Sequence, residues 1–428
     1  MKKIFSWFCC ALLATAVGCA QPKKPSHQIE VWHWMTDRQD ALEVMAKKYE
    51  QETGIKVKIE LFAPSDAYSQ KVIAAAQANV LPDIYGILSK KAIVASFIKA
   101  GYVADLSADF AAHDSAWEKS MFVKALDVNR FPEGNIEKVK PGLYGVPIDV
   151  TNIQLIYNKK LLRKAGITRP PETFTEFVSQ IKALKRVGIV PFVSGFGEMW
   201  LVECFALNYA FNIMGEEKVF KTFRGEVPYT DPDWIQVFSV FKTLTDHGAF
   251  MQGIVTKGNK LAEQDFALGR AAFAFNGSWC VNVYHDMNPS LEYGVIQLPP
   301  INSALPMRMW GGAGSSFEVS NSSPNKDKAI SFLKWLTAKE QQVFLSEQTN
   351  NLPANREALG AIPQVLAEFS RVMETVTHPS VWPLNEDPLA LETFVKGIQS
   401  IMIAESTPER VAQDVAAVKE RQLDKMKR

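Results

Sequence analysis

Tryptophan residues are the side chains of this sequence that most clearly suggest a chemical role. The chain has ten tryptophans among its 428 residues. An indole ring offers a large, rigid apolar surface and has few rotatable bonds to immobilise when it binds a ligand. Five tryptophans stand beside turns, glycines, prolines or strand ends: Trp34, Trp200, Trp279, Trp310 and Trp382. Their chemistry favours recognition of the flat apolar face of a small molecule.

Polar residues in similar positions could orient such a ligand through hydrogen bonds. The candidates are Asp37, Asp83, Asp149, Asn152 and Glu203. Some of them have an obvious structural alternative. Asp37 could cap the helix that follows it, and Asp83 could be a buried carboxylate or a turn residue at the start of a strand. Glu203 could lie on a solvated helix face.

The tryptophans have packing alternatives as well. Trp34 could belong to the core of the first strand, where alternation places Trp32 on the same face and His33 on the other. His33 could be a cleft residue or a surface histidine, and we expect the surface position. Trp200 lies in GFGEMWLVE, a glycine-rich turn that leads into a helix, and core packing explains that position poorly. Trp382, in the proline loop HPSVWPLNE, could either pack against the fold or line the rim of a cleft.

The sequence lacks the patterns of common catalytic and cofactor sites. It has no G-x-S-x-G, no P-loop, no Cys/His spacing typical of zinc and no paired-carboxylate motif. We therefore predict no catalytic residue, no metal site and no cofactor. The 47 basic and 46 acidic residues nearly balance, and no basic run occurs, so nucleic acid is not expected as a partner.

The amino-terminal segment predicts export. Residues 1–18 have a basic start and an apolar stretch that is too short to span a bilayer, as in a signal peptide. The small residues before Cys19 resemble the lipobox of bacterial lipoproteins, although Ala16 stands where leucine is usual. An ordinary signal peptide cleaved nearby is the alternative. Residues 19–28 then form a polar, proline-containing tether for the lipid anchor.

Two cysteines belong to the folded body. Cys204 and Cys280 could pair in an oxidising compartment or remain buried thiols, and their spacing does not decide between the two. We expect the protein to lie in the periplasm or on the cell surface, attached to the membrane through lipid at Cys19.

The order of strand and helix patterns indicates an α/β fold. Residues 29–34 alternate like a strand, and a helical pattern follows up to Gly54. This succession continues and predicts a largely parallel sheet. The other predicted elements are strands at 55–62, 81–88 and 150–158, helices at 66–79 and 170–188, two helices or one broken helix at 324–347, and a helical carboxyl terminus from Leu389 with Pro408 in a first turn.

Five segments resemble one protein family in order and in spacing. The most specific is IYNKKLLRKAGITRPPETFTEFV at 156–178. The others are KKYEQETGIKVKIE (47–60), LPDIYGI (81–87), ALGRAAFAFNGSW (267–279) and WGGAGSSFEVSNSSPNKDKAISFLKWL (310–336). On these residues the chain is similar to the bacterial extracellular solute-binding proteins of sugar ABC importers, the broad group that includes the maltose-binding proteins.

The resemblance implies a fold of two α/β lobes joined by hinge strands, the periplasmic-binding-protein fold, with a ligand cleft between the lobes. Mapped onto this chain, lobe one would hold residues 29–149 plus 312–372. Lobe two would hold residues 150–311 plus 373–428. Such lobes close on their ligand by hinge motion.

The resemblance also bears on the site residues. In this family the segment that ends in FNGSW carries an aromatic residue that stacks on the ligand, which here is Trp279. Asp149 and Asn152 lie at the implied crossing between the lobes, where polar residues often face the ligand. Gly312 would let the backbone approach the ligand closely.

The function implied is capture of a mono- or oligosaccharide and its delivery to the permease subunits of an ABC importer, by a monomeric protein that is not an enzyme. Sugars have apolar faces and hydroxyl-bearing edges, which suits the tryptophans and polar residues above. Two alternatives stay open. One is a binding protein for another solute, such as a phosphorylated polyol, a polyamine or an iron–anion complex. The other is an exported glycosidase that uses two carboxylates.

Overall fold

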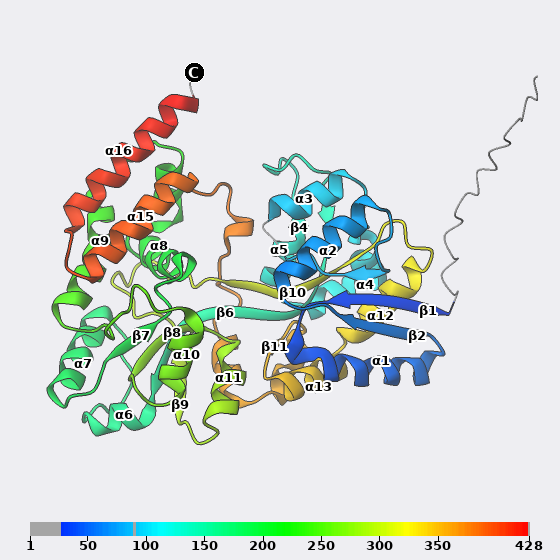
Figure 1. Ribbon diagram of the computed structural model, residues 1–428, viewed down its shortest axis with the longest axis horizontal. Helices are drawn as coiled ribbons and strands as arrows, with labels where there is room; N and C mark the ends of the chain where they lie inside the picture. Colours follow the sequence, from blue (N-terminus) through cyan, green and yellow to red (C-terminus); the bar gives the residue numbers. More distant parts are fainter. Residues whose placement is uncertain (1–26, 89–90, 427–428) are drawn as a thin grey trace, which may run out of the picture.

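The computed structural model describes residues 27–88 and 91–426. The predicted signal peptide and Cys19 lie outside the described residues. The helices and strands gather into two α/β lobes, and the long strands β6 (Val146–Asn158) and β10 (Gly311–Val319) run from one lobe to the other (Figure 1). We call the lobe that contains β1 lobe one and the lobe that contains β7 and β8 lobe two. The α/β fold with two lobes is the fold expected from the sequence.

The strands are short apart from β6 and β10. They are β1 (Gln28–His33), β2 (Lys56–Leu61), β3 (Ile84–Tyr85), β4 (Arg130–Phe131), β5 (Gly142–Leu143), β7 (Phe192–Ser194), β8 (Phe273–Gly277), β9 (Tyr293–Ile296) and β11 (Leu352–Pro353). The strand predicted at 81–88 is therefore confirmed only at Ile84–Tyr85.

Helices cover the sheet in both lobes. The α-helices of the first half are α1 (Gln39–Thr53), α2 (Ser65–Gln77), α3 (Lys91–Lys99), α4 (Ser107–Ser120), α5 (Val123–Asn129), α6 (Lys159–Lys164), α7 (Phe174–Arg186) and α8 (Met199–Phe223). Those of the second half are α9 (Pro232–Asp246), α10 (Asn259–Ala267), α11 (Cys280–Met287), α12 (Lys326–Leu336), α13 (Lys339–Thr349), α14 (Gln364–Ser370), α15 (Pro388–Met402) and α16 (Pro408–Met426). Short 3-10 helices are η1 (Thr36–Arg38), η2 (Arg356–Ala361) and η3 (Pro379–Val381).

One sheet connects the lobes. In the described part of the chain its strand order is β2-β1-β3-β10-β6-β8-β7, with β9 and β11 also paired to β6. β1 runs parallel to β2 and β3, and β7 runs parallel to β8, but β10 and β6 are antiparallel. The sheet is therefore mixed, which corrects the expectation of a largely parallel sheet. β10 arrives from the other lobe, so no local crossover helix sets its direction.

Strand β6 carries the chain across the junction. All of its residues except Thr151 and Tyr157 are buried, and it pairs with β10 and β11 in its first half and with β8 and β9 in its second. A strand covered on both faces shows a nearly continuous apolar pattern instead of alternation. That is why the pattern at 150–158 was sufficient to predict it, although it begins four residues earlier.

The helix ends follow local rules, with some differences from expectation. Helix α1 ends at Gly54, whose φ of 73° favours glycine. Arg38 stands at its N-cap position without a side-chain bond to the helix, so the capping role predicted for Asp37 is wrong. Helix α7 is capped by Thr173, which accepts from the Glu176 amide, and the two prolines lie before it rather than in its first turn. Pro408 begins α16, as predicted.

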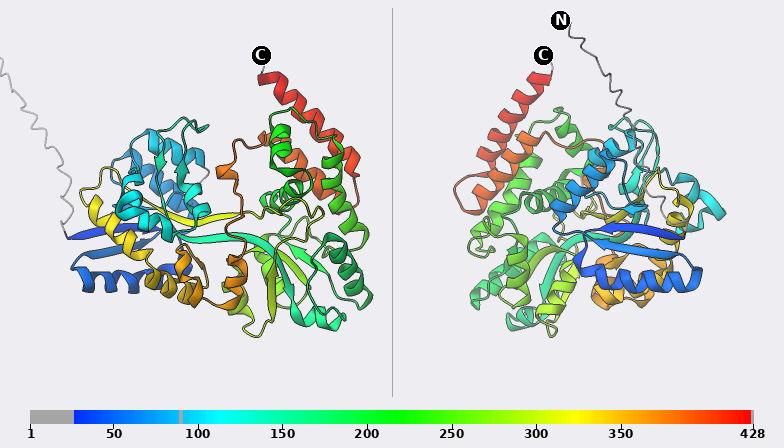
Figure 2. Two further views of the ribbon diagram at one scale, coloured as in Figure 1. Left: turned by 180° about the vertical axis from the view of Figure 1, so that it is seen from behind. Right: turned by 45° about the vertical axis from the view of Figure 1, so that its right-hand side comes forward.

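The hydrophobic core runs through both lobes. A second cluster in lobe one includes side chains of α2 and α3, and Trp32, Tyr68 and Tyr85 belong to it. Figure 2 shows from two further sides that α15 and α16 cover lobe two, whereas β1 lies in lobe one. Cys204 and Cys280 are both buried and are free thiols, so they do not form a disulfide with each other in this structure.

Candidate functional site

Two of the predicted tryptophans meet at one edge of the sheet in lobe two. Parallel strands bring their carboxyl ends to the same edge, and β7 and β8 are parallel. Trp279 follows two residues after β8, and Trp200 is the second residue of α8, after the turn that leaves β7. Their ring centroids lie 6.0 Å apart with the ring planes at 55°. Both side chains are half-buried, so this tryptophan pair keeps part of its surface open to solvent.

Carboxylates hold both indole N–H groups of the tryptophan pair. Trp200 Nε1 donates to Glu198 Oε2 at 2.7 Å, and Trp279 Nε1 donates to Glu263 Oε1 at 2.9 Å. Glu198 Oε1 also accepts from the backbone N–H of Asn259, the first residue of α10, at 2.6 Å. Because both indole N–H groups are already bonded, a ligand would meet the ring faces and carbon edges of this pair.

Gly277 has no side chain, and this leaves room for the Trp279 ring. A Cβ on Gly277 would stand 2.0 Å from an indole carbon of Trp279, so any larger residue there would force the ring to move. The φ angle of Gly277 is not positive, so its backbone conformation does not require glycine. Glycine is needed there because it leaves space beside the backbone. The indole thus packs back across the end of β8.

Lobe one has a similar arrangement at the carboxyl ends of its own parallel strands. Trp34 follows β1, and Gly86 follows β3, where a Cβ would stand 2.2 Å from an indole carbon of Trp34. The Tyr68 ring lies 5.4 Å from the Trp34 ring, and its hydroxyl bonds the Trp32 carbonyl and both backbone groups of Gly86. β1 runs from the outer side of lobe one toward the junction (Figure 1). Trp34 is therefore a half-buried aromatic residue at the junction end of its strand.

An ion pair joins η1 to the crossing strands. Arg38 Nη2 lies 2.6 Å from Asp149 Oδ2, and Arg38 Nη1 donates to Ser315 Oγ at 2.8 Å. Asp149 also accepts from the Ser315 backbone N–H at 2.6 Å, next to irregular pairing in β10. Burial raises the pKa of Asp149 to about 6, against the opposing effect of Arg38. Asp149 lies at the crossing, as expected, but its carboxylate is bonded to protein groups and is only 3% exposed.

Asp83 and Asn152 are fully buried among protein partners. Asp83 accepts from the Glu30 backbone N–H at 2.9 Å and from Ser323 Oγ at 2.6 Å. Asn152 donates to the Phe369 carbonyl at 2.9 Å. His33 is buried as well, with Nε2 2.7 Å from Gln39 Oε1, which corrects the expectation of a surface histidine.

Trp310 and Trp382 lie in the core. Trp310 is 7% exposed and Trp382 6% exposed, and their rings pack edge to face at 5.5 Å. Trp382 also packs against three phenylalanines, namely Phe211, Phe220 and Phe223. Its Nε1 donates to Thr377 Oγ1 at 2.7 Å. The proline loop therefore turns this ring inward, which is the packing alternative for Trp382 rather than the rim position.

Gly312, Asp37 and Glu203 complete the predicted set. Gly312 has φ of 153°, and a Cβ there would stand 2.7 Å from a methyl of Val128 on α5. The close approach at Gly312 is thus to the Val128 side chain. Asp37 is exposed and lies 3.3 Å from Asn351 Nδ2. Glu203 is half-buried one turn after Trp200 on α8.

Sequence reasoning missed the residues that hold the aromatic rings. No sequence motif marks Glu198, Glu263 or Tyr68. They hold the rings through contacts between elements that are distant in the chain. Glu198 stands two residues before Trp200 in the turn GFGE, which is the one local signal that could have identified it.

The pKa of one histidine predicts a pH dependence of stability. Burial, together with the charge of Lys91, lowers the pKa of His378 from 6.5 to about 4. Neutral His378 accepts from the Ser380 N–H at 3.1 Å and caps η3. Because the unfolded state then binds more protons between these two pKa values, stability should be lost as the pH falls from about 6.5 to about 4, by up to ~3 kcal/mol.

Urea unfolding of the wild type and of His378→Asn at about pH 7 and about pH 4 measures this effect. Asparagine keeps a capping acceptor but does not titrate. The variant should therefore lose less stability in acid than the wild type. Equal acid losses in the two proteins would show that this histidine contributes nothing to the pH dependence.

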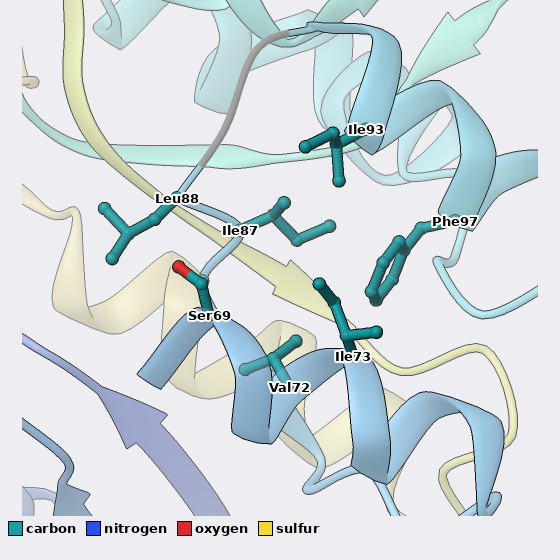
Figure 3. Close-up of a pocket in the computed structure, with 8 residues that line it drawn as sticks. Ser69, Val72, Ile73, Ile87, Leu88, Ile93 and Phe97 are labelled. Carbon is teal, nitrogen blue, oxygen red and sulfur yellow. The ribbon is translucent and has the colours of Figure 1, made fainter. Parts of the chain in front are cut away.

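A small apolar cavity lies in lobe one between α2, α3 and the segment after β3. Figure 3 shows Val72, Ile73, Ile87 and Phe97 pointing into it. The space open to the centre of a water-sized sphere is about 10 Å³, enough for one water molecule at most. The cavity is far too small for a sugar and plays no part in the candidate site.

Among the residues that the structure describes, no group of three or more His, Cys, Asp or Glu is placed to hold a metal ion. In the two described ranges, no helix combines the length and the apolar character that a bilayer crossing requires.

Known proteins resemble this chain in sequence and in fold. A binding protein of Brucella abortus (strain 2308) is 25% identical over 280 residues, 64% of this chain and 66% of the relative. The chain thus spans just under two thirds of the length of that relative. The "Maltooligosaccharide ABC transporter solute-binding lipoprotein" of Streptococcus pneumoniae serotype 4 is 23% identical over 354 residues, 74% of this chain and 70% of the relative.

The solved structure of unliganded RafE from Streptococcus pneumoniae has a similar fold, with a TM-score of 0.73 and 18% identity over 92% of this chain and 98% of that one. The family model described as "Bacterial extracellular solute-binding protein" matches residues 33–343, which is more than half of the chain. This protein therefore belongs to the bacterial extracellular solute-binding protein family.

Proposed function

We propose that this protein is the substrate-binding lipoprotein of an ABC importer, and that it captures a carbohydrate between its two lobes for delivery to the permease. The observation that carries the proposal is the tryptophan pair of Trp200 and Trp279. Its indole N–H groups are bonded to Glu198 and Glu263, so the accessible ring surface is apolar and suits the C–H face of a pyranose. Family membership and the name of the pneumococcal maltooligosaccharide relative support the same ligand class.

Each lobe supplies part of the proposed site. Lobe two supplies Trp200 and Trp279, and lobe one supplies Trp34, whose strand ends at the junction. Asp37 and Glu203 are the accessible carboxylates of the predicted set and are proposed to accept hydrogen bonds from sugar hydroxyls. Closure of the lobes would bring these groups onto one ligand.

The buried members of the predicted set bond to or pack against other parts of the protein. Asp83, Asn152, Trp310, Gly312 and Trp382 are engaged with protein groups, and Asp149 is paired with Arg38. We assign them to the framework of the lobes. The lobe boundaries remain as proposed from the sequence, at 29–149 plus 312–372 and at 150–311 plus 373–428.

A ligand screen by thermal shift tests the proposal. A ligand that binds only the folded state raises the melting temperature. We expect a rise with a neutral mono- or oligosaccharide, and none with a polyamine or a phosphorylated polyol. The bound sugar should be recovered unchanged by chromatography. Stabilisation by one of the charged ligands alone would move the assignment to another solute, and recovery of a hydrolysed sugar would make the protein an enzyme.

Attachment through Cys19 gives a separate prediction. Cys19→Ala should move the protein from the membrane fraction to the soluble fraction of the exporting cell, because no other lipid-bearing residue is proposed. Fractionation followed by immunoblotting measures this, with Cys204→Ala as a control that keeps the anchor. Wild-type protein that is already soluble in intact cells would contradict lipid attachment.

A further inference from the structure

A buried carboxylate stands behind the tryptophan pair. Glu263, on α10, has no exposed surface. Its Oε1 accepts from Trp279 Nε1 at 2.9 Å, from Asn259 Nδ2 at 2.9 Å and from Asn276 Nδ2 at 3.2 Å. Its Oε2 lies 3.2 Å from the Lys260 ammonium, whose side chain is 78% exposed. One oxygen thus collects three N–H donors from α10, β8 and the start of α11.

Placing a carboxylate here is unfavourable by itself. A buried charge is stabilised only when hydrogen bonds and partner charges replace its lost hydration. The solvent-exposed Lys260 is a weak counter-charge for Glu263, so the neutral N–H donors must supply much of the stabilisation. Trp279 is the only one of these donors whose side chain also reaches solvent. The carboxylate therefore connects the buried framework directly to the accessible ring.

The hydrogen bond to Glu263 fixes the ring plane of Trp279. An indole N–H lies in the plane of its ring, so its direction and the contact with Gly277 together leave the ring little freedom. Trp200 is fixed in the same manner by Glu198, which also bonds the Asn259 backbone at the start of α10. The first turn of α10 is therefore common to both carboxylates, and it relates the two rings to each other.

We propose that Glu263 is a positioning residue for ligand binding, which holds the Trp279 ring at its angle to Trp200 before the sugar arrives. The inference rests on the proposed function, since the ring is taken to stack on a sugar. A ring that is already ordered loses less entropy on binding, and so the affinity is higher. Glu263 itself is buried and does not touch the ligand.

Glu263→Gln is the informative variant. Glutamine has nearly the same shape but no charge, and its amide nitrogen cannot accept a hydrogen bond. Hydrogen bonds to charged groups are stronger than neutral ones, so sugar affinity should fall roughly tenfold, equal to about 1.4 kcal/mol. The matched control is Asp265→Asn on the same helix. Asp265 is also buried, but it pairs with Lys257 and Arg270 and contacts neither tryptophan. Its variant should bind within about twofold of wild type.

A double-mutant cycle separates positioning from a general effect on the fold. Trp279→Phe keeps an aromatic ring but removes the N–H group. In that background Glu263→Gln should change affinity by less than about twofold, because the bond it weakens is no longer present. A tenfold loss that persists in the Trp279→Phe background would overturn the proposal, as would wild-type affinity of the single variant Glu263→Gln.

Circular dichroism tests the positioning without any ligand. Two indoles in contact produce a coupled signal whose size depends on the angle between them. This signal should change in Glu263→Gln and stay the same in Asp265→Asn, and an unchanged signal in Glu263→Gln would overturn the proposal. If the wild type binds no sugar while this signal responds as expected, the proposed ligand fails but the positioning of Trp279 by Glu263 stands.

Discussion

Replacing Trp279 with alanine should weaken sugar binding by about 2–4 kcal/mol, the scale of a binding hot spot, or roughly thirty- to a thousandfold in Kd. The indole is half-buried, rests across Gly277 and contacts Trp200. Its loss would remove the apolar surface for the sugar and leave the Trp200 ring without its neighbour. Calorimetric titration with the sugar identified by thermal shift measures the effect.

Stability must be followed in the same protein. Trp279→Ala also leaves Glu263 with one donor fewer, so we expect unfolding to become easier by about 1–3 kcal/mol. Trp335→Ala is the matched control. Trp335 is another half-buried tryptophan whose Nε1 donates to a carboxylate, Glu52, at 2.7 Å, but it lies in lobe one on α12. Its variant should keep wild-type affinity. Near-wild-type affinity of Trp279→Ala would refute the stacking role.

Trp382→Ala should have the opposite effect: it should lower the free energy of unfolding and leave the affinity for the sugar nearly unchanged. This ring is 6% exposed and fills space between Phe211, Phe220, Phe223 and Trp310. Truncation of such a buried aromatic residue destabilises a protein by about 3–5 kcal/mol. Affinity, measured well below the melting temperature, should stay close to wild type.

Urea unfolding together with titration distinguishes these outcomes for Trp382. Trp382→Phe serves as the milder control, because it keeps an aromatic ring but loses the hydrogen bond to Thr377. A large loss of affinity in Trp382→Ala with little loss of stability would mean that the ring lines the ligand site after all.

The fold was predictable where the pattern is local or long. The buried strand β6 and the helices α1, α7 and α16 follow from periodicity and end signals. The direction of β10 could not be predicted from the sequence. Its partner β6 lies more than 150 residues away, and the residue pattern of a strand does not indicate such a distant partner. The short β3 shows a similar limit, since the apolar residues on either side of Ile84–Tyr85 are buried or half-buried but lie outside the strand.

The parts of the candidate site were predictable separately, but their contact was not. Trp200 and Trp279 stand beside glycine-containing turns at strand ends, and that context identified each of them separately. Their contact depends on β7 and β8 being neighbours, which the sequence does not reveal. Asp83 was predicted as a candidate ligand contact because it lies early in its strand, and Asn152 because it lies at the implied crossing between the lobes. A polar residue in either position can bind a ligand or another protein group. Burial decides between the two, and burial is known only from the fold.

Glu263 illustrates the part that sequence reasoning could not reach. The local sequence of α10 does not distinguish Glu263 from an ordinary helix residue. A glutamate on a solvent-exposed helix face would have no special role. Glu263 accepts three N–H groups only because the fold brings Asn276, on β8, and Trp279, just before α11, next to Asn259.

We propose above all that a carbohydrate binds between the two lobes and draws them together. Small-angle X-ray scattering of the protein with and without a saturating amount of the identified sugar tests it most directly. We predict a smaller radius of gyration with the sugar, and a smaller change for Trp279→Ala at the same sugar concentration. An unchanged radius of gyration in wild-type protein that calorimetry shows to be saturated would contradict the account.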